Sequence, residues 1–213
     1  MDSKKLAIII PGMGYTKDRP LLYYAGKLFA AAGYELLHIE FTNLPKKIRG
    51  NRELILKTAI QCYDQTSTQL ASTDFSAYTD LLFVGKSIGT IVAARYIAEH
   101  NLEARQIWYT PLQETLDTAF SGTTGTLGTA SINASLSSTY HAGTPSADPA
   151  NILAFIGTAD PWSDLPKLLN TAAENHLDIH VYENCNHSLE TNDVDKNIEI
   201  LRDVMHITKD LLF

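Results

Sequence analysis

The chain has 213 residues, of which 45% are hydrophobic, and its formal net charge is -7. This length suits one core of ordinary size, so we expect a single domain over residues 1–213. Its 17 Lys and Arg and 24 Asp and Glu form no long runs, so we expect no nucleic-acid partner. No apolar stretch is long enough to span a membrane, and Pro11 and Gly12 end the first apolar run too early for a signal peptide.

The only cysteines, Cys62 and Cys185, form no CxxC pair and have no metal-ligand spacing. We therefore expect two reduced thiols and, from that, a cytoplasmic location. The sequence does not indicate an oligomeric state.

Short apolar or aromatic segments bounded by turn residues recur along the chain and predict strands. They are Leu6 to Ile10, Glu35 to Phe41, Asp80 to Val84, Gln106 to Tyr109, Ile152 to Ile156 and Asp178 to Tyr182. The last alternates more than the others, as expected nearer a sheet edge. Between them, apolar residues spaced by three and four predict helices near residues 22–32, 55–63, 90–99, 165–172 and 194–205. This alternation predicts a doubly wound, mainly parallel six-stranded sheet with helices on both faces.

The segment Ser121 to Ala150 breaks this pattern. It is crowded with Ser, Thr, Gly and Ala, and its large apolar or aromatic residues are only Leu127, Ile132, Leu136 and Tyr140. We expect an irregular excursion between strands rather than a second domain. With so little apolar surface to bury a long chain, we expect activity to be highest on acyl groups of about two to four carbons.

The predicted strand that ends at Val84 is followed at once by Gly85-Lys86-Ser87-Ile88-Gly89 and then by a predicted helix. GxSxG between a strand and a helix needs glycine on both sides, because the serine sits on a strained turn where neighbouring side chains would collide. Such a turn exposes the serine hydroxyl and directs the first helix amides toward it. Ser87 is therefore a candidate nucleophile.

A serine nucleophile needs a histidine base, and the histidine needs an acid to orient it. Asp160 follows the strand ending at Ile156, and His187 lies in the loop after the strand ending at Tyr182. Parallel α/β sheets build their sites at the carboxyl ends of strands. Asp164 is the alternative acid, although it could instead cap the helix near residue 165. We favour Asp160.

Taken together, the loops at 85–89, 157–160 and 186–188 resemble the three catalytic loops of the α/β-hydrolase family, in the family order Ser, Asp, His. The resemblance implies a compact member without the first two strands of the fuller fold and without a large cap. It also implies that the Met13 and Ile88 amides hold a developing oxyanion, with Gly14 as the alternative donor to Met13. This chain has Pro11-Gly12 where many members have His-Gly.

Residues near these loops are substrate-binding candidates: Gly12, Gly14, Tyr15, Lys86 and Trp162. Lys86 could lend positive potential beside the nucleophile, but we expect its side chain to face solvent. Trp162 could line an acyl pocket or pack its own loop, and Tyr15 could meet a polar substrate.

The resemblance implies a serine hydrolase that cleaves a small carboxylic ester through an acyl-enzyme, with a small acyl compound as partner and no cofactor or metal. Thioesterase, dienelactone-type hydrolase and acyltransferase activities use the same residues and stay open. So does a non-catalytic binding module on a hydrolase scaffold. A histidine base predicts activity that rises through an apparent pKa of about 6 to 7.

Overall fold

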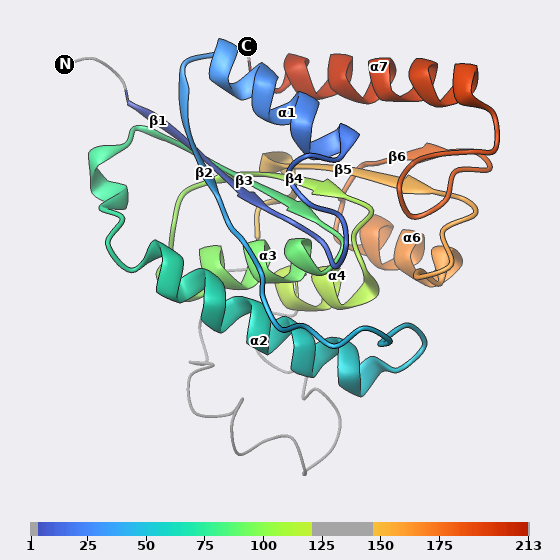
Figure 1. The fold of residues 1–213 in the computed structure, drawn as a ribbon, viewed down its shortest axis with the longest axis horizontal. Coiled ribbons are helices and arrows are strands. Elements are labelled where there is room, and N and C mark those ends of the chain that lie inside the picture. The colour runs from blue at the N-terminus through green and yellow to red at the C-terminus, as the bar shows by residue number, and fades with distance from the viewer. Residues whose placement is uncertain (1–3, 121–146, 213) are drawn as a thin grey trace.

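A computed structural model describes residues 4–120 and 147–212 of the chain. Within these ranges a six-stranded sheet has the order β2-β1-β3-β4-β5-β6, and all its neighbouring strands pair in parallel (Figure 1). Each predicted strand is present, with ends moved by at most a few residues. The strands are β1 Lys5–Ile10, β2 Tyr34–His38, β3 Asp80–Lys86, β4 Arg105–Tyr109, β5 Ile152–Gly157 and β6 Ile179–Tyr182.

Helices cover both faces of the sheet, as predicted. They are α1 Pro20–Ala31, α2 Arg52–Leu70, α3 Ile88–His100, α4 Gln113–Phe120, α6 Leu165–Glu174 and α7 Val194–Asp210. Helices α1 and α7 lie on one face, and α2, α3, α4 and α6 lie on the other (Figure 1). The sequence pattern did not predict α4. Single 3-10 turns at Phe75–Ala77 and Pro149–Asn151 precede β3 and β5.

The central strands are apolar throughout because helices bury both of their faces. On β3, Phe83 points into the core beneath α2 and α3, whereas Val84 points into the core beneath α1 and α7, and both are fully buried. Burying a side chain of this size contributes about 1.5–3 kcal/mol. Strand β6 is only partly buried along its length, because it is the last strand of the sheet. Its more alternating sequence had predicted this edge position.

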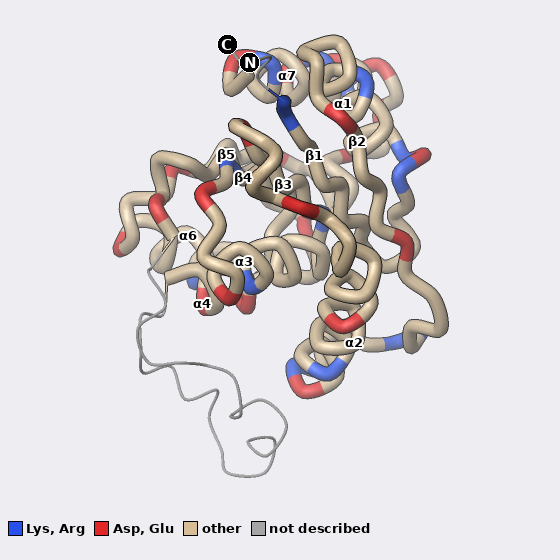
Figure 2. Tube along the Cα trace, turned by 90° about the vertical axis from the view of Figure 1, so that its left-hand side faces the viewer, with Lys and Arg blue, Asp and Glu red and all other residues tan. Residues whose placement is uncertain are grey.

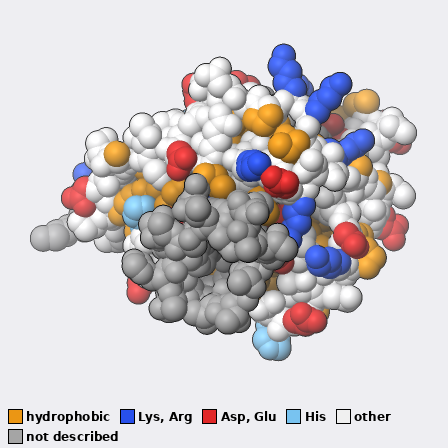
Figure 3. Space-filling model, turned by 90° about the horizontal axis from the view of Figure 1, so that it is seen from below, with side chains coloured by type: hydrophobic (Ala, Val, Ile, Leu, Met, Phe, Trp, Pro, Cys, Tyr) orange, Lys and Arg blue, Asp and Glu red, His pale blue; other side chains and the backbone are white. Residues whose placement is uncertain are grey.

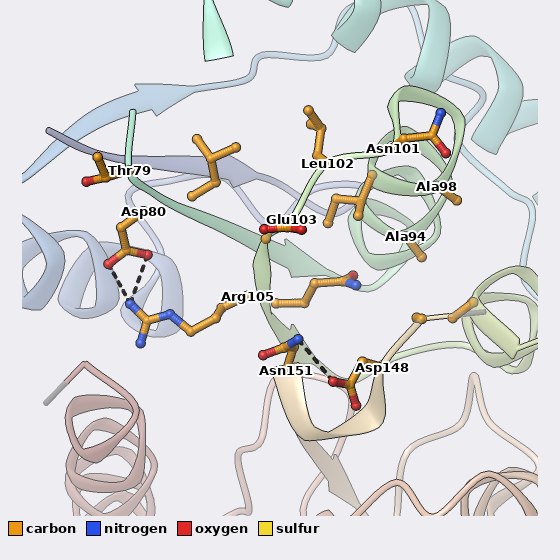
Figure 4. A pocket seen from close by; sticks show the side chains of 16 residues that line it. Thr79, Asp80, Ala94, Ala98, Asn101, Leu102, Glu103, Arg105, Asp148 and Asn151 are labelled. Atoms are coloured by element: carbon orange, nitrogen blue, oxygen red, sulfur yellow. Dashed lines mark hydrogen bonds and ion pairs between the residues drawn. The ribbon is translucent and has the colours of Figure 1, made fainter. Parts of the chain in front are cut away.

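At the amino ends of the strands, an ion pair between Arg105 and Asp80 (2.8 Å) joins β4 to β3. Arg105 also donates to the Tyr34 hydroxyl and to the Leu211 carbonyl. A cavity of about 600 Å³ lies beside this pair, and Figure 4 shows Arg105 and Asp80 on its wall. Because it lies at the end of the sheet away from Ser87, we assign it no part in the candidate site.

Charged side chains are dispersed over the described surface. Lys and Arg are interspersed with Asp and Glu along the trace (Figure 2), and the face seen from the α2 side mixes the two signs (Figure 3). Over residues 4–120 and 147–212, no helix combines the length and apolar character needed to cross a membrane.

Most of the segment expected to be irregular, residues 121–146, lies outside the described residues. At its far end, the Ala147 amide donates to the Ala119 carbonyl of α4 (2.9 Å), and the turn Pro149–Asn151 leads into β5. The expectation of a single domain without a large cap stays a prediction.

Candidate active site

Ser87 sits on a sharp turn between β3 and α3. Its φ of 55° and ψ of -123° lie in a region that non-glycine residues rarely adopt. A β-carbon on Gly85 would stand 2.7 Å from Thr90 Cα, and one on Gly89 would stand 2.5 Å from the Ile10 carbonyl oxygen. Only glycine fits at both positions, which is the steric reason that the GxSxG pattern had suggested.

Hydrogen bonds on both sides hold this turn. The Ser87 amide donates to the Tyr109 carbonyl at the end of β4 (3.0 Å). The Thr90 hydroxyl, one turn into α3, donates to the Ser87 carbonyl (2.6 Å) and also contacts the Thr115 hydroxyl (2.6 Å). The strained backbone is therefore kept in place by its neighbours rather than by its own preference.

The structure brings the three predicted residues together. His187 Nε2 lies 2.7 Å from Ser87 Oγ, and His187 Nδ1 lies 2.7 Å from Asp160 Oδ2. The Asp160 side chain is 1% exposed, and its second oxygen accepts the Trp162 amide (2.9 Å). With Asp160 ionised, Nδ1 carries the proton and Nε2 is free to accept the serine proton. This is the geometry that a nucleophile, a base and an orienting acid require.

Asp164, the alternative acid, has a different role. It is the N-cap residue of α6, and its carboxylate accepts the Lys167 amide (3.3 Å). Of the two carboxylates, Asp160 therefore contacts His187, as we favoured, and Asp164 caps the helix.

Residues that the sequence did not single out join the acid loop to the histidine loop. The Thr158 amide donates to the Tyr182 carbonyl (2.9 Å), and the Ala159 amide donates to the Cys185 carbonyl (3.0 Å). The Asn186 side chain accepts the Ser188 amide (2.7 Å) and so closes the turn that carries His187. This role of Asn186 could have been recognised from the sequence, because Asn readily forms such turns.

The first loop makes a tight turn against the nucleophile. Gly12 and Tyr15 exchange two backbone hydrogen bonds, of 3.1 and 3.3 Å, and Gly14 has a φ of 70°, as the third position of a type II turn requires. A β-carbon on Gly12 would lie 3.2 Å from Ser87 Cβ, so a larger residue would have to push the loop or the nucleophile turn slightly aside. Among the described residues, no partner accepts a hydrogen bond from the Met13 or Ile88 amide, which leaves both available as oxyanion donors.

We had expected the Lys86 side chain to face solvent, but the structure buries it. Its side chain is 1% exposed, because β3 continues through residue 86 and turns it into the core beneath α1. Its Nζ donates to the Thr110 hydroxyl (2.5 Å) and lies 5.0 Å from the centre of the Tyr15 ring. Burial lowers the pKa of Lys86 to about 7, although the nearby Asp160 carboxylate acts in the opposite direction.

Tyr15 packs behind the site rather than lining it. The residue is 9% exposed, and its hydroxyl accepts the Leu21 amide (3.1 Å). Burial raises the pKa of Tyr15 to about 12. The expectation that Tyr15 meets a polar substrate is therefore not supported, because α1 covers its hydroxyl.

The pKa of His187 is lowered, first by burial and then by the positive charge of Lys86, while the Asp160 carboxylate acts to raise it. A lowered pKa favours the neutral imidazole, which is the form that accepts a proton.

A cleft of about 590 Å³ lies between the turn at 12–14 and the loop at 39–46, and Trp162 forms part of its wall. Its apolar lining residues are Met13, Ile39, Phe41, Leu44 and Trp162, and its charged ones are Lys17, Asp18, Glu40 and Lys46, of which Lys17 and Glu40 form an ion pair (2.9 Å). Trp162 also stacks on the His187 ring, with centroids 5.3 Å apart. Trp162 therefore lines a pocket and packs its loop at once. No cluster of His, Cys, Asp or Glu within the described ranges could hold a metal ion.

The comparisons with known proteins agree with this fold. No family model and no curated protein matches the chain. Among solved structures, the ferulic-acid complex of Est1E from Butyrivibrio proteoclasticus is 14% identical, with a TM-score of 0.59 over 99% of this chain and 88% of that one. A dienelactone hydrolase from Anabaena variabilis is also 14% identical, with a TM-score of 0.56 over 99% and 86%. An alpha-beta serine hydrolase homologue from Coxiella burnetii is 12% identical, with a TM-score of 0.56 over 97% and 85%.

These likenesses extend over nearly the whole chain. The chain therefore has the α/β-hydrolase fold, as the three loops had suggested.

Proposed function

We propose that the protein is a serine hydrolase that cleaves a small carboxylic ester through an acyl-enzyme. The observation that carries this proposal is the continuous contact from Ser87 Oγ through His187 to the buried Asp160, with both distances at 2.7 Å. A module that only binds a ligand needs neither a serine on a strained turn nor a histidine held in one tautomer. The dienelactone hydrolase among the structural neighbours supports the same class of chemistry.

In the proposed mechanism, Ser87 Oγ attacks the ester carbonyl while His187 Nε2 takes its proton. The Met13 and Ile88 amides donate to the oxygen that becomes negative, and each such donor is worth about a hundredfold to a thousandfold in rate. His187 then gives its proton to the leaving alcohol as the C–O bond breaks. Water repeats the sequence on the acyl-enzyme and releases the acid. Asp160 stays ionised throughout and stabilises the imidazolium.

The cleft at 12–14 and 39–46 suits an apolar group attached to the ester. Met13, Phe41, Leu44 and Trp162 all line it, and Trp162 stacks on the His187 ring. Apolar walls with few polar groups are typical of small-ligand sites. We therefore propose an uncharged apolar or aromatic group as the part of the substrate held there.

A fluorophosphonate probe tests the proposal. The wild type should be labelled at Ser87, and Ser87→Ala should lose both labelling and ester hydrolysis while keeping its circular dichroism spectrum. Ser72→Ala, on an exposed turn before β3, is the matched control and should behave as the wild type.

Full turnover by Ser87→Ala, or an unlabelled wild type, would contradict a serine hydrolase and favour the binding module. A panel of ester, thioester and lactone substrates, with and without an alcohol acceptor, then separates the ester hydrolase from the thioesterase, dienelactone-type and acyltransferase alternatives.

A further inference from the structure

Lys86 is a buried basic group that the proposed mechanism does not use. It directly precedes the nucleophile, its side chain is 1% exposed, and placing an ammonium in such a site is costly. None of the salt bridges found over the described ranges includes it. A methionine or leucine would fill the same position at lower cost, so the amine calls for a functional explanation.

The contacts of Lys86 lead to the histidine. Its Nζ donates to the Thr110 hydroxyl (2.5 Å), and that hydroxyl donates to the His187 carbonyl (3.2 Å). The Tyr15 ring also faces the ammonium at 5.0 Å. The lysine is thus held by the residue that follows β4 and by the first loop, and two hydrogen bonds connect it to the backbone carbonyl of His187.

We propose that Lys86 is a positioning residue that opposes protonation of His187 and so keeps the imidazole available as a base in mildly acidic solution. This inference depends on the proposed function for its catalytic meaning. The electrostatic coupling itself can be measured on protein that lacks the nucleophile.

The physical basis is the competition of two cations for one carboxylate. Lys86 and a protonated His187 would both lie near Asp160 in a buried region, where charges interact strongly. Among the described residues, the titratable groups beside Lys86 and His187 are Asp160, Tyr15 and Tyr109. The two tyrosines have raised pKa values, so they stay neutral, and the charged groups Glu190 and Arg19 also act on Tyr15. Thr110 and Trp162 do not titrate. With Lys86 charged, the second positive charge on His187 is disfavoured.

Lys86 should affect the protonation of His187 only below about neutral pH. Its pKa is lowered to about 7, so above that pH the amine is mostly neutral and exerts little field on His187. A residue with only a structural role would change activity at every pH, whereas Lys86 should change it only where the amine is charged. This difference makes the proposal testable.

The main variant is Lys86→Met, which removes the charge and keeps the length of the side chain. The matched control is Lys27→Met, which makes the same change in net charge on the exposed face of α1. In a Ser87→Ala background, NMR titration of the His187 ring should give a pKa higher in Lys86→Met by about half to one pH unit. Lys27→Met should leave it unchanged. In protein with Ser87, the ratio of kcat/KM at about pH 5.5 to that at about pH 8 should fall roughly three- to tenfold.

An unchanged His187 pKa in Lys86→Met, or an equal loss of kcat/KM at all pH values, would overturn the proposal. If Lys86→Met does not fold, the Ser87→Ala protein with its native lysine provides the second measurement. In that protein the Lys86 Cε resonance should titrate near neutral pH, with a matching step in the His187 resonances. Titration of Lys86 near its ordinary value of 10.5 would also overturn the proposal. Failure of the proposed function is distinguished by absent probe labelling, which leaves the NMR coupling unaffected.

Discussion

Gly157, at the end of β5, packs directly against Cys185 in the loop that carries His187. A β-carbon at position 157 would stand 2.1 Å from the Cys185 carbonyl oxygen and 2.6 Å from its carbonyl carbon. Both are backbone atoms, which cannot move aside as a flexible side chain would. The glycine therefore sets how closely the acid loop and the histidine loop approach, and with it the contact of Asp160 with His187.

Gly157→Ala should displace the histidine loop. We expect it to lower the free energy of unfolding by about 2–4 kcal/mol and to reduce kcat more than KM. Gly26→Ala is the control, because a β-carbon there meets side chains at ordinary contact distances, the nearest being Ile9 at 3.4 Å. In the interior of α1 it should be neutral or stabilise by up to about 1 kcal/mol. Urea unfolding and ester kinetics measure both, and a Gly157→Ala variant with wild-type stability would refute the close approach.

Asp160→Asn should keep the fold and lose most of the rate. The new amide can still accept the Trp162 amide through its oxygen, but its NH₂ group then faces His187 Nδ1 and selects the wrong tautomer. We expect kcat to fall by about 10³- to 10⁴-fold. Asp164→Asn should retain both rate and stability, because Asn is an equally good N-cap residue. If Asp164→Asn were the slower enzyme, the acid would have been assigned incorrectly.

The acid limb of kcat/KM should have its midpoint below 6.5, the ordinary pKa of histidine. Only neutral His187 accepts the serine proton, so a group whose pKa is lowered by burial stays active at lower pH. From the sequence alone we expected this midpoint at a pH of about 6 to 7. The burial of the His187 ring now favours the lower part of that range. Rates of fluorophosphonate labelling across the acid range measure it directly. A midpoint above 6.5 would mean that Asp160 outweighs burial and Lys86 combined.

The strands and the three catalytic loops could be predicted because each has a local signature. A strand such as Ile152 to Ile156 is uniformly apolar since both of its faces are covered, and GxSxG is a pattern of five consecutive residues between a strand and a helix. Lys86 could not be predicted, because its surroundings come from Thr110 and Tyr15 on other strands and loops. The role of Gly157 could not be predicted either, because its contact is with Cys185 in the loop that follows the next strand.

The stability of the protein should rise above neutral pH because of Lys86. In the folded state the pKa of Lys86 is about 7, against 10.5 for the free side chain, so between these values the unfolded chain binds one more proton than the folded one. The free energy of unfolding should therefore increase with pH by roughly 1.4 kcal/mol per pH unit in this window. Lys86→Met should lack this slope, since the other titrating groups are shared. Parallel slopes from about pH 7 to 9 for the two proteins would contradict a buried amine.

The last prediction concerns the size of the acyl group. The expectation of an optimum at about two to four carbons depended on the segment 121–150, most of which lies outside the described residues. The cleft changes that expectation, because Phe41, Leu44 and Trp162 supply apolar walls among the described residues. Each methylene buried there adds about 0.8 kcal/mol of binding, or roughly fourfold in affinity.

We therefore expect kcat/KM for nitrophenyl esters to increase beyond butyrate and to peak at about six carbons. Leu44→Trp should fill the cleft and return the optimum to acetate or butyrate, without lowering the rate on acetate. Leu54→Trp, on the exposed face of α2, controls for the added indole. If Leu44→Trp lowered the rates on acetate and hexanoate equally, the cleft would not be the acyl site. A wild-type peak at acetate would restore the shorter expectation, because the acyl chain would then gain nothing from the apolar walls at 39–46.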